Sequence, residues 1–174
     1  MLQAIDRSNS IQRRRMIDKL RDLVGGFEGR TVCLLGLSFK PDTDDVREAP
    51  ALEMAGELLR EGAAVQAYDP AAMGRARALL PEIACFDDPC AAAAGADALV
   101  LMTEWNEFRN IDWPRIRESL AAPRLLDCRN LYDPREMAEL GFDYVSVGRP
   151  RGRHGEAEPA AGGRMRPARL APVG

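Results

Sequence analysis

Short apolar runs alternate with helix-length segments along most of this chain. Each run is bounded by Gly, Pro or polar residues, as strands are. We expect strands at 31–35, 64–68, 83–86, 98–102, 124–127 and 142–147. Helices are expected between them at 50–60, 71–80, 88–94, 113–120 and 134–140. This order is typical of a parallel sheet with helices on both faces, so the sequence predicts an open α/β sheet.

A longer helix is predicted ahead of the sheet. Leu2, Ile5, Met16, Leu20 and Leu23 recur on one face at steps of three and four, and Gly25-Gly26 end the pattern. An isolated helix is marginal in water, so we expect this one to dock on the following domain or on another subunit. The predicted organisation is therefore a helix at 1–26, an α/β domain at 27–149 and a disordered basic tail at 150–174.

Composition and charge exclude several classes of protein. The net charge is −3, and the six arginines and two glutamates from Arg149 onward contribute +4, which leaves −7 for the rest. An acidic body argues against a nucleic-acid-binding surface. The four cysteines form no C-x-x-C pair and the single histidine is His154, so a zinc site or a disulfide framework is not expected. No apolar run approaches a membrane span and the start has no signal peptide, so we expect a cytoplasmic location.

Charged residues gather in the loop that follows the first expected strand, residues 36–50. Lys40 can meet a phosphate or carboxylate as a point charge, and Arg47 can do so with a planar fork. Pro50 suits the first turn of the next helix. Four acids stand beside the cations, and we expect some to hold them and some to cap the helix: Asp42, Asp44, Asp45 and Glu48. The alternative is an ordinary solvated loop with local salt bridges.

Polar residues also follow two later strands. Glu104 and Trp105 come after strand 98–102, and Arg129 and Asn130 come after strand 124–127. The carboxyl ends of parallel strands lie along one edge of a sheet, where ligands bind in such folds. A site with two or three cations is therefore predicted there, and it suits a phosphorylated ligand. For Trp105 the alternative is packing over the end of the sheet.

The glycine pattern restricts how a nucleotide would be held. Strand 31–35 is followed by Gly-Leu-Ser-Phe-Lys rather than G-x-G-x-x-G, and no strand-linked G-x-x-x-x-G-K-[ST] occurs. The usual close approach of backbone to a pyrophosphate is therefore not expected in this turn. Side chains would have to hold much of any bound nucleotide.

Four stretches together resemble a known family. They are GLSFKPDTDDVREAP at 36–50, YDPAAM at 68–73, TEWNEF at 103–108 and LLDCRNLYDP at 125–134. They look like the signatures of the UDP-glucose 6-dehydrogenases, within the UDP-glucose/GDP-mannose dehydrogenase family. The resemblance runs from about residue 2 to Arg149. It covers the family's C-terminal UDP-sugar-binding domain, a Rossmann-like fold, plus the end of the central helical domain.

The resemblance implies NAD-dependent oxidation of UDP-glucose to UDP-glucuronate, with a cysteine as the covalent nucleophile. By motif position, Phe39 and Lys40 would contact the UDP-sugar and Arg129 would hold it from its strand end. Arg47 would reach toward the phosphates of NAD. The family dimerises largely through its middle domain, so a homo-oligomer is a possible assembly.

This chain also departs from the family pattern. It contains neither the N-terminal Rossmann domain with G-x-G-x-x-G nor the G-G-x-C-x-x-K-D segment with the catalytic cysteine. Cys128 stands where family members usually have Gly. We therefore expect no catalytic residue here, NAD bound mainly by the missing domain, and no activity without a complementing N-terminal half. The alternatives are a stand-alone nucleotide-sugar-binding or assembly module, or a fragment of a GDP-mannose or UDP-N-acetylmannosamine dehydrogenase.

Overall fold

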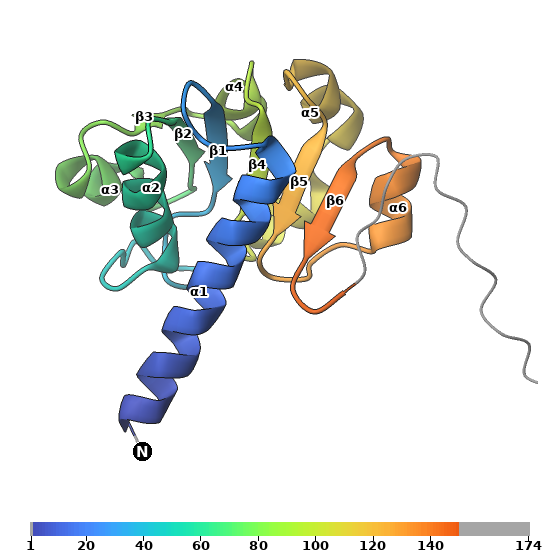
Figure 1. The fold of residues 1–174 in the computed structure, drawn as a ribbon. Helices are drawn as coiled ribbons and strands as arrows, with labels where there is room; N and C mark the ends of the chain where they lie inside the picture. Colours follow the sequence, from blue (N-terminus) through green and yellow to red (C-terminus); the bar gives the residue numbers. More distant parts are fainter. Residues whose placement is uncertain (1, 150–174) are drawn as a thin grey trace, which may run out of the picture.

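Six parallel strands form one sheet in the order β3-β2-β1-β4-β5-β6 (Figure 1). The computed structural model describes residues 2–149, with side chains from residue 11 onward. The strands are β1 (Thr31–Leu35), β2 (Ala64–Tyr68), β3 (Ala84–Cys85), β4 (Ala98–Leu101), β5 (Arg124–Asp127) and β6 (Asp143–Ser146). Every neighbouring pair is parallel. The predicted Rossmann-like open parallel sheet is confirmed, and its order reverses between β1 and β4.

Helices connect the strands much as the sequence predicts. They are α1 (Leu2–Val24), α2 (Pro50–Arg60), α3 (Met73–Leu79), α4 (Pro89–Ala93), α5 (Trp113–Ser119), α6 (Pro134–Glu139) and the short 3-10 helix η1 (Asn106–Asn110). Helix α3 was expected from residue 71, but the N–H groups of Ala71 and Ala72 donate to the carboxylate of Asp69. These two residues form a turn for that reason, and the helix begins later.

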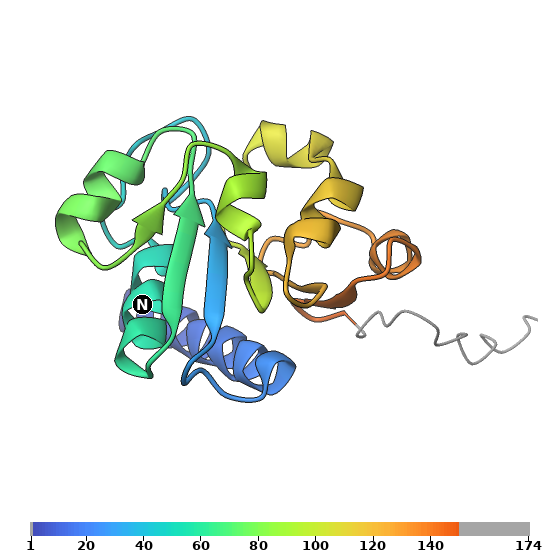
Figure 2. The same cartoon turned by 90° about the horizontal axis from the view of Figure 1, so that it is seen from above.

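The helices lie on both faces of the sheet, as expected (Figure 2). Side chains on each strand alternate between the faces. Val32 and Leu34 pack into the cluster under α1, α2 and α3, while Cys33 and Leu35 pack into the cluster under α4, α5 and α6. All four residues of β4 are buried, as befits a strand at the centre of the sheet.

Helix α1 docks its C-terminal half on the sheet. Four side chains of this half are buried in the core: Met16, Leu20, Leu23 and Val24. Arg21 pairs with Glu61 at 2.7 Å, and the helix ends where Gly25 (φ 78°) donates its N–H to the carbonyl of Arg21. The N-terminal end extends past the carboxyl edge of the sheet (Figure 1). The predicted docking is confirmed, whereas the assignment of 1–26 to a separate central domain stays a prediction.

Two negative findings apply to residues 2–149. No helix there is long and apolar enough to cross a bilayer. No group of three or more His, Cys, Asp or Glu side chains within the described part is arranged to hold a metal ion. The predicted tail at 150–174 lies outside the described residues.

Candidate functional site

The loops that follow β1, β4 and β5 are joined by hydrogen bonds at the carboxyl edge of the sheet. The hydroxyl of Thr103, after β4, donates to the carbonyl oxygen of Ser38, after β1, at 2.7 Å. Nε of Arg129, after β5, donates to the carbonyl oxygen of Met102 at 2.6 Å. Met102 and Thr103, the two residues that follow β4, therefore contact the loop after β5 and the loop after β1, respectively. The structure brings the three predicted strand ends together, and Lys40 lies two residues beyond Ser38.

The β1–β4 junction is closed at the point where a doubly wound sheet usually receives its ligand. Gly36 has φ +89°, and a Cβ there would lie 2.5 Å from Cβ and 2.7 Å from the backbone N of Thr103. These distances are below van der Waals contact, so only glycine fits. A ligand at this edge must therefore lie outside the junction, against the loops.

A buried carboxylate, Asp69, ties these loops together. It lies at the end of β2 with no solvent exposure. Its Oδ2 accepts the N–H groups of Leu37 and Ser38 at 2.7 and 3.0 Å and the indole N–H of Trp105 at 3.1 Å. Two further N–H groups donate to its Oδ1, as described above. The sequence did not predict this role, for which the signal is an Asp-Pro pair at a strand end. The indole hydrogen bond shows that Trp105 packs over the end of the sheet, as in the alternative for this residue.

A second buried carboxylate organises the loop after β5. Asp127 is fully buried, and its Oδ1 accepts the backbone N–H of Arg129 at 2.8 Å. Its Oδ2 accepts from the N–H groups of Leu131 and Tyr132 and from the hydroxyl of Tyr144. The backbone that carries Arg129 is therefore held in place before any ligand binds.

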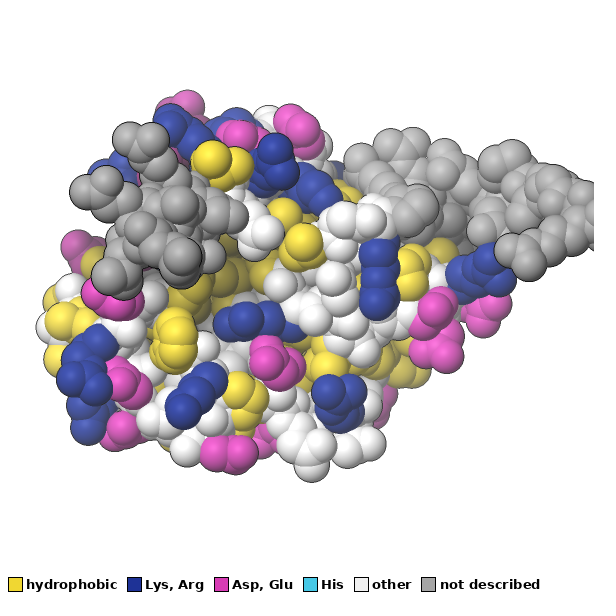
Figure 3. Space-filling view, turned by 90° about the horizontal axis from the view of Figure 1, so that it is seen from below, with side chains coloured by type: hydrophobic (Ala, Val, Ile, Leu, Met, Phe, Trp, Pro, Cys, Tyr) yellow, Lys and Arg dark blue, Asp and Glu magenta, His cyan; other side chains and the backbone are white. Residues whose placement is uncertain are grey.

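Phe39 and Lys40 lie at the surface of this edge. The Phe39 side chain is 53% exposed, although the backbone N–H of Phe39 donates to the carbonyl oxygen of Asp45 at 2.9 Å. Lys40 is exposed, and the structure shows no ion pair for it among the described residues. Figure 3 shows Lys and Arg side chains among hydrophobic and acidic ones on this face. An exposed aromatic beside an unpaired cation remains free to bind a ligand.

Arg47 is paired with its own loop. Its guanidinium lies 2.7–3.2 Å from the two carboxylate oxygens of Asp45, and its side chain is 84% exposed. The paired Arg47 holds the pKa of Asp45 well below its usual value, and the carboxylate raises the pKa of Arg47. Asp44 pairs with Arg75 of α3 at 2.7 Å. The expectation that acids hold the loop's cations is thus confirmed for Arg47.

The expectation that one of these acids caps α2 is wrong. The N-cap residue is Ala49, with no capping bond from a side chain. Asp44 and Asp45 are engaged with arginines, and Glu48 lies one residue too early, in the left-handed region at φ 54°. Pro50 lacks the N–H that would need a partner in the first turn, as predicted.

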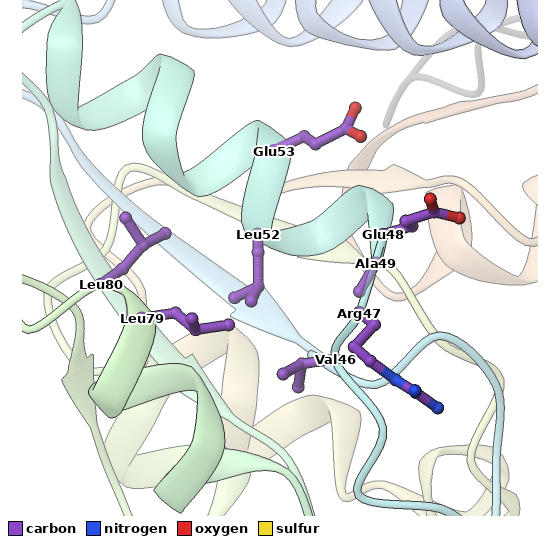
Figure 4. A pocket seen from close by; sticks show the side chains of 8 residues that line it. All are labelled: Val46, Arg47, Glu48, Ala49, Leu52, Glu53, Leu79 and Leu80. Carbon is purple, nitrogen blue, oxygen red and sulfur yellow. The ribbon is translucent and has the colours of Figure 1, made fainter.

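Two open hollows flank Arg47. The first, of about 360 Å³, is lined by Phe39, Asp45, Arg47 and Glu48. The second, of about 310 Å³, lies between α2 and α3, and Leu52, Leu79 and Val46 point into it while Arg47 points away (Figure 4). Lys40 and Arg129 line neither of these two hollows. Phe39 and Arg47 therefore share a surface hollow that Arg129 does not line.

None of the four cysteines is an activated nucleophile. Burial raises the pKa of every one of them, and that of Cys128 reaches about 12. A nucleophilic thiol needs a lowered pKa. The Cys128 side chain packs against the core under α1 and α2, so a residue larger than Gly is accommodated beside Arg129.

The described residues do not fit a dinucleotide in this domain's own crevice. Gly36 and Thr103 close the β1–β4 junction. The acid at the end of β2, which binds the ribose of NAD in dinucleotide folds, is here Asp69, buried and hydrogen-bonded throughout. Arg47 is 84% exposed at this edge, and within the described residues its ion-pair partner is Asp45.

Fold and site together define a class: a doubly wound α/β domain with cationic and aromatic side chains at the carboxyl edge of its sheet. Residues 33–134 match the UDP-glucose/GDP-mannose dehydrogenase family, UDP binding domain. Because this match spans more than half of the chain, the chain belongs to that family.

The relatives agree with this assignment. The chain is 48% identical over 167 residues to a UDP-glucose 6-dehydrogenase of Pseudomonas aeruginosa, covering 92% of this chain and 37% of that enzyme. It is similar to the solved UDP-glucose dehydrogenase of Pyrobaculum islandicum (TM-score 0.64, 35% identity, 72% of this chain and 28% of that one). A second similar structure is the NDP-N-acetyl-D-galactosaminuronic acid dehydrogenase of Methanosarcina mazei (TM-score 0.68, 25% identity, 84% and 30%). The chain spans about a third of the length of the relatives it matches.

Proposed function

We propose that this chain is the UDP-sugar-binding portion of an NAD-dependent UDP-glucose 6-dehydrogenase, which converts UDP-glucose to UDP-glucuronate. The observation that carries the proposal is the meeting of three strand-end loops at one edge of the sheet, with Lys40 and Arg129 on two of them. The family match to a UDP binding domain supports a UDP-sugar as the ligand. The 48% identity to a UDP-glucose 6-dehydrogenase favours glucose over other sugars.

Each side chain has a proposed role. Lys40, which is exposed and unpaired among the described residues, binds a phosphate of UDP. Phe39 offers an exposed aromatic face to the same ligand. Arg129 directs hydrogen bonds at the UDP-sugar from the end of β5. Arg47 projects from the edge toward the phosphates of NAD.

The proposed enzyme needs a second half. Bound NAD would supply the hydride acceptor for oxidation at C6 of the sugar. The described residues do not fit a dinucleotide in this domain's own crevice, so another domain is proposed to hold it. A complementing N-terminal half is therefore a proposed partner, and a homo-oligomer formed through α1 and the rest of a central helical domain is another. A cytoplasmic location and inactivity of this chain alone belong to the same proposal.

Calorimetric titration tests the binding site. UDP, UDP-glucose and UDP-glucuronate are titrated into the full chain and into Lys40→Ala and Arg129→Ala. Loss of a charge-assisted hydrogen bond costs about 1.5–3 kcal/mol, so each variant should bind roughly 10- to 150-fold more weakly. Arg60→Ala removes a cation of α2 that pairs with Glu57, and it should bind normally. Unchanged affinity in both site variants would exclude them from the site.

Two further experiments separate the alternatives. No heat with any UDP ligand would favour an assembly module, and tighter binding of GDP-mannose or UDP-N-acetylmannosamine would point to another sugar. Mixing the chain with a relative's N-terminal half should produce NADH from UDP-glucose if the proposal holds. Binding without any restored activity would favour a stand-alone binding module.

A further inference from the structure

The guanidinium of Arg129 is held from one side only. Its Nε lies 2.6 Å from the carbonyl oxygen of Met102 and 3.1 Å from Oε2 of Glu104. Nε carries a single N–H, and the carbonyl takes it, so Glu104 acts on the guanidinium mainly through charge. Among the described residues, neither terminal nitrogen of Arg129 has a hydrogen-bond partner. Those two nitrogens are the part of the side chain left for a ligand.

The carboxylate of Glu104 lies on the Nε side of the Arg129 guanidinium. Its Oε2 is shielded from solvent and accepts no well-aligned hydrogen bond within residues 11–149. The residues on either side of it are held through their side chains, because the hydroxyl of Thr103 donates to the carbonyl oxygen of Ser38 and the indole of Trp105 donates to the buried Asp69. The Glu104 side chain is 42% exposed, but it extends from a chain segment anchored on both sides, and its carboxylate lies against Nε of Arg129.

We propose that Glu104 is a positioning residue for Arg129. It holds the Nε side of the guanidinium and so presents the two terminal nitrogens to the UDP-sugar. The inference rests on the proposed function, because it takes Arg129 as a ligand-binding residue. The TEWNEF stretch then contributes to binding through Arg129 rather than by touching the ligand itself.

The positioning role and simple charge repulsion predict opposite effects on UDP affinity when Glu104 is removed. A carboxylate close to an anion-binding site repels the ligand, so its removal alone would tighten binding. Glu104, however, lies 3.1 Å from the cation, and the guanidinium stands between it and a ligand on the terminal nitrogens. Charge interactions weaken with distance, so the hold on Arg129 outweighs the repulsion. Removal of Glu104 should therefore weaken binding.

The experiment titrates UDP into the full chain and five variants, Arg129→Ala among them. Glu104→Ala should bind UDP about two- to fivefold more weakly, the range expected for a partly exposed ion pair, and the near-isosteric Glu104→Gln should lie between it and the parent. Glu118→Gln removes the same charge from an exposed position of α5 and should bind as the parent does. In an Arg129→Ala background, adding Glu104→Ala should cause no further weakening.

Each outcome has one meaning. Binding to both Glu104 variants that equals or exceeds that of Glu118→Gln overturns the positioning role, while weak binding by Arg129→Ala alone leaves the proposed function standing. Normal UDP binding by Arg129→Ala would contradict both the proposed role of Arg129 in the site and the positioning role of Glu104. If Glu104→Ala does not fold, Glu104→Gln decides, with its unfolding temperature measured beside the parent's.

Discussion

Replacement of Asp69 with asparagine should destabilise this protein far more than a change of one side-chain atom suggests. The carboxylate is fully buried at the end of β2 and accepts five hydrogen bonds. The donors are the N–H groups of Leu37, Ser38, Ala71 and Ala72 and the indole of Trp105. They come from the segments that follow β1, β2 and β4, and two of these segments belong to the candidate site, so the effect measures how firmly one buried group holds that site.

The magnitude follows from how an amide would fit the same space. Asparagine has one acceptor oxygen, so its NH₂ group must face either the two N–H groups of Ala71 and Ala72 or the three donors on the other side. The better orientation leaves two donors without a partner: the buried N–H of Ala72 and the N–H of Ala71, which is an exposed residue. An unsatisfied buried donor costs about 1–3 kcal/mol and a partly exposed one costs less, so Asp69→Asn should lower the free energy of unfolding by about 1–4 kcal/mol. A domain of this size has about 5–15 kcal/mol in total.

Urea denaturation followed by circular dichroism measures this loss. Asp88→Asn is the matched control, because Asp88 also accepts two backbone N–H groups at 2.9 Å, from Cys90 and Ala91. It lies exposed at the N-cap of α4, where asparagine caps as well as aspartate, so its cost should be below about 0.5 kcal/mol. Costs that agree within about 0.5 kcal/mol for the two variants would refute the reasoning.

Three further outcomes are expected. Gly36→Ala should lower the free energy of unfolding by about 2–4 kcal/mol in urea denaturation, because the new Cβ would clash with Thr103 and the backbone there is left-handed. Gly74→Ala in α3, where the new Cβ would meet nothing, should be neutral or stabilising. Equal stability of the two would contradict the closed junction. The carboxyl of Asp45 has a pKa below its ordinary 3.8, so its pairing stabilises fully above that pH and is lost as the pH falls through the lower, folded value. A ¹³C shift titration should find this carboxylate still ionised at pH 3, and protonation there would contradict the ion pair. At pH 8, iodoacetamide should leave Cys33 and Cys128 unmodified until urea is added, as peptide mass spectrometry can show.

Local features of the sequence were enough to predict the helices and strands. The run Thr31–Leu35 and the segment Pro50–Arg60 have the bounds in the structure that the sequence predicted, because an apolar run between glycines and a proline at a helix start act locally. One helix start differed from the prediction. Residues 71 and 72 lie outside the helix because the side chain of Asp69, two and three residues before them, binds their N–H groups.

The sequence was enough to propose residues for the candidate site, but not to predict which ion pairs they form. Charged residues after strands identified Lys40, Arg47 and Arg129, and the parallel order placed all of them on one edge. The sequence could not show that Asp45 pairs with Arg47 while Asp44 binds Arg75, since neighbouring acids in one loop are alike in pattern. Only the folded backbone decides which carboxylate meets which cation.

By itself the sequence determined the elements, their parallel order and the chemical character of the edge, because periodicity and turn residues act over a few positions. The tertiary structure alone decided the sheet order, the closure of the β1–β4 junction by Gly36 and Thr103, and the roles of Asp69 and Asp127. These depend on groups far apart in the chain coming within hydrogen-bond distance. Burial then turns two ordinary aspartates into the groups that hold the candidate site in shape.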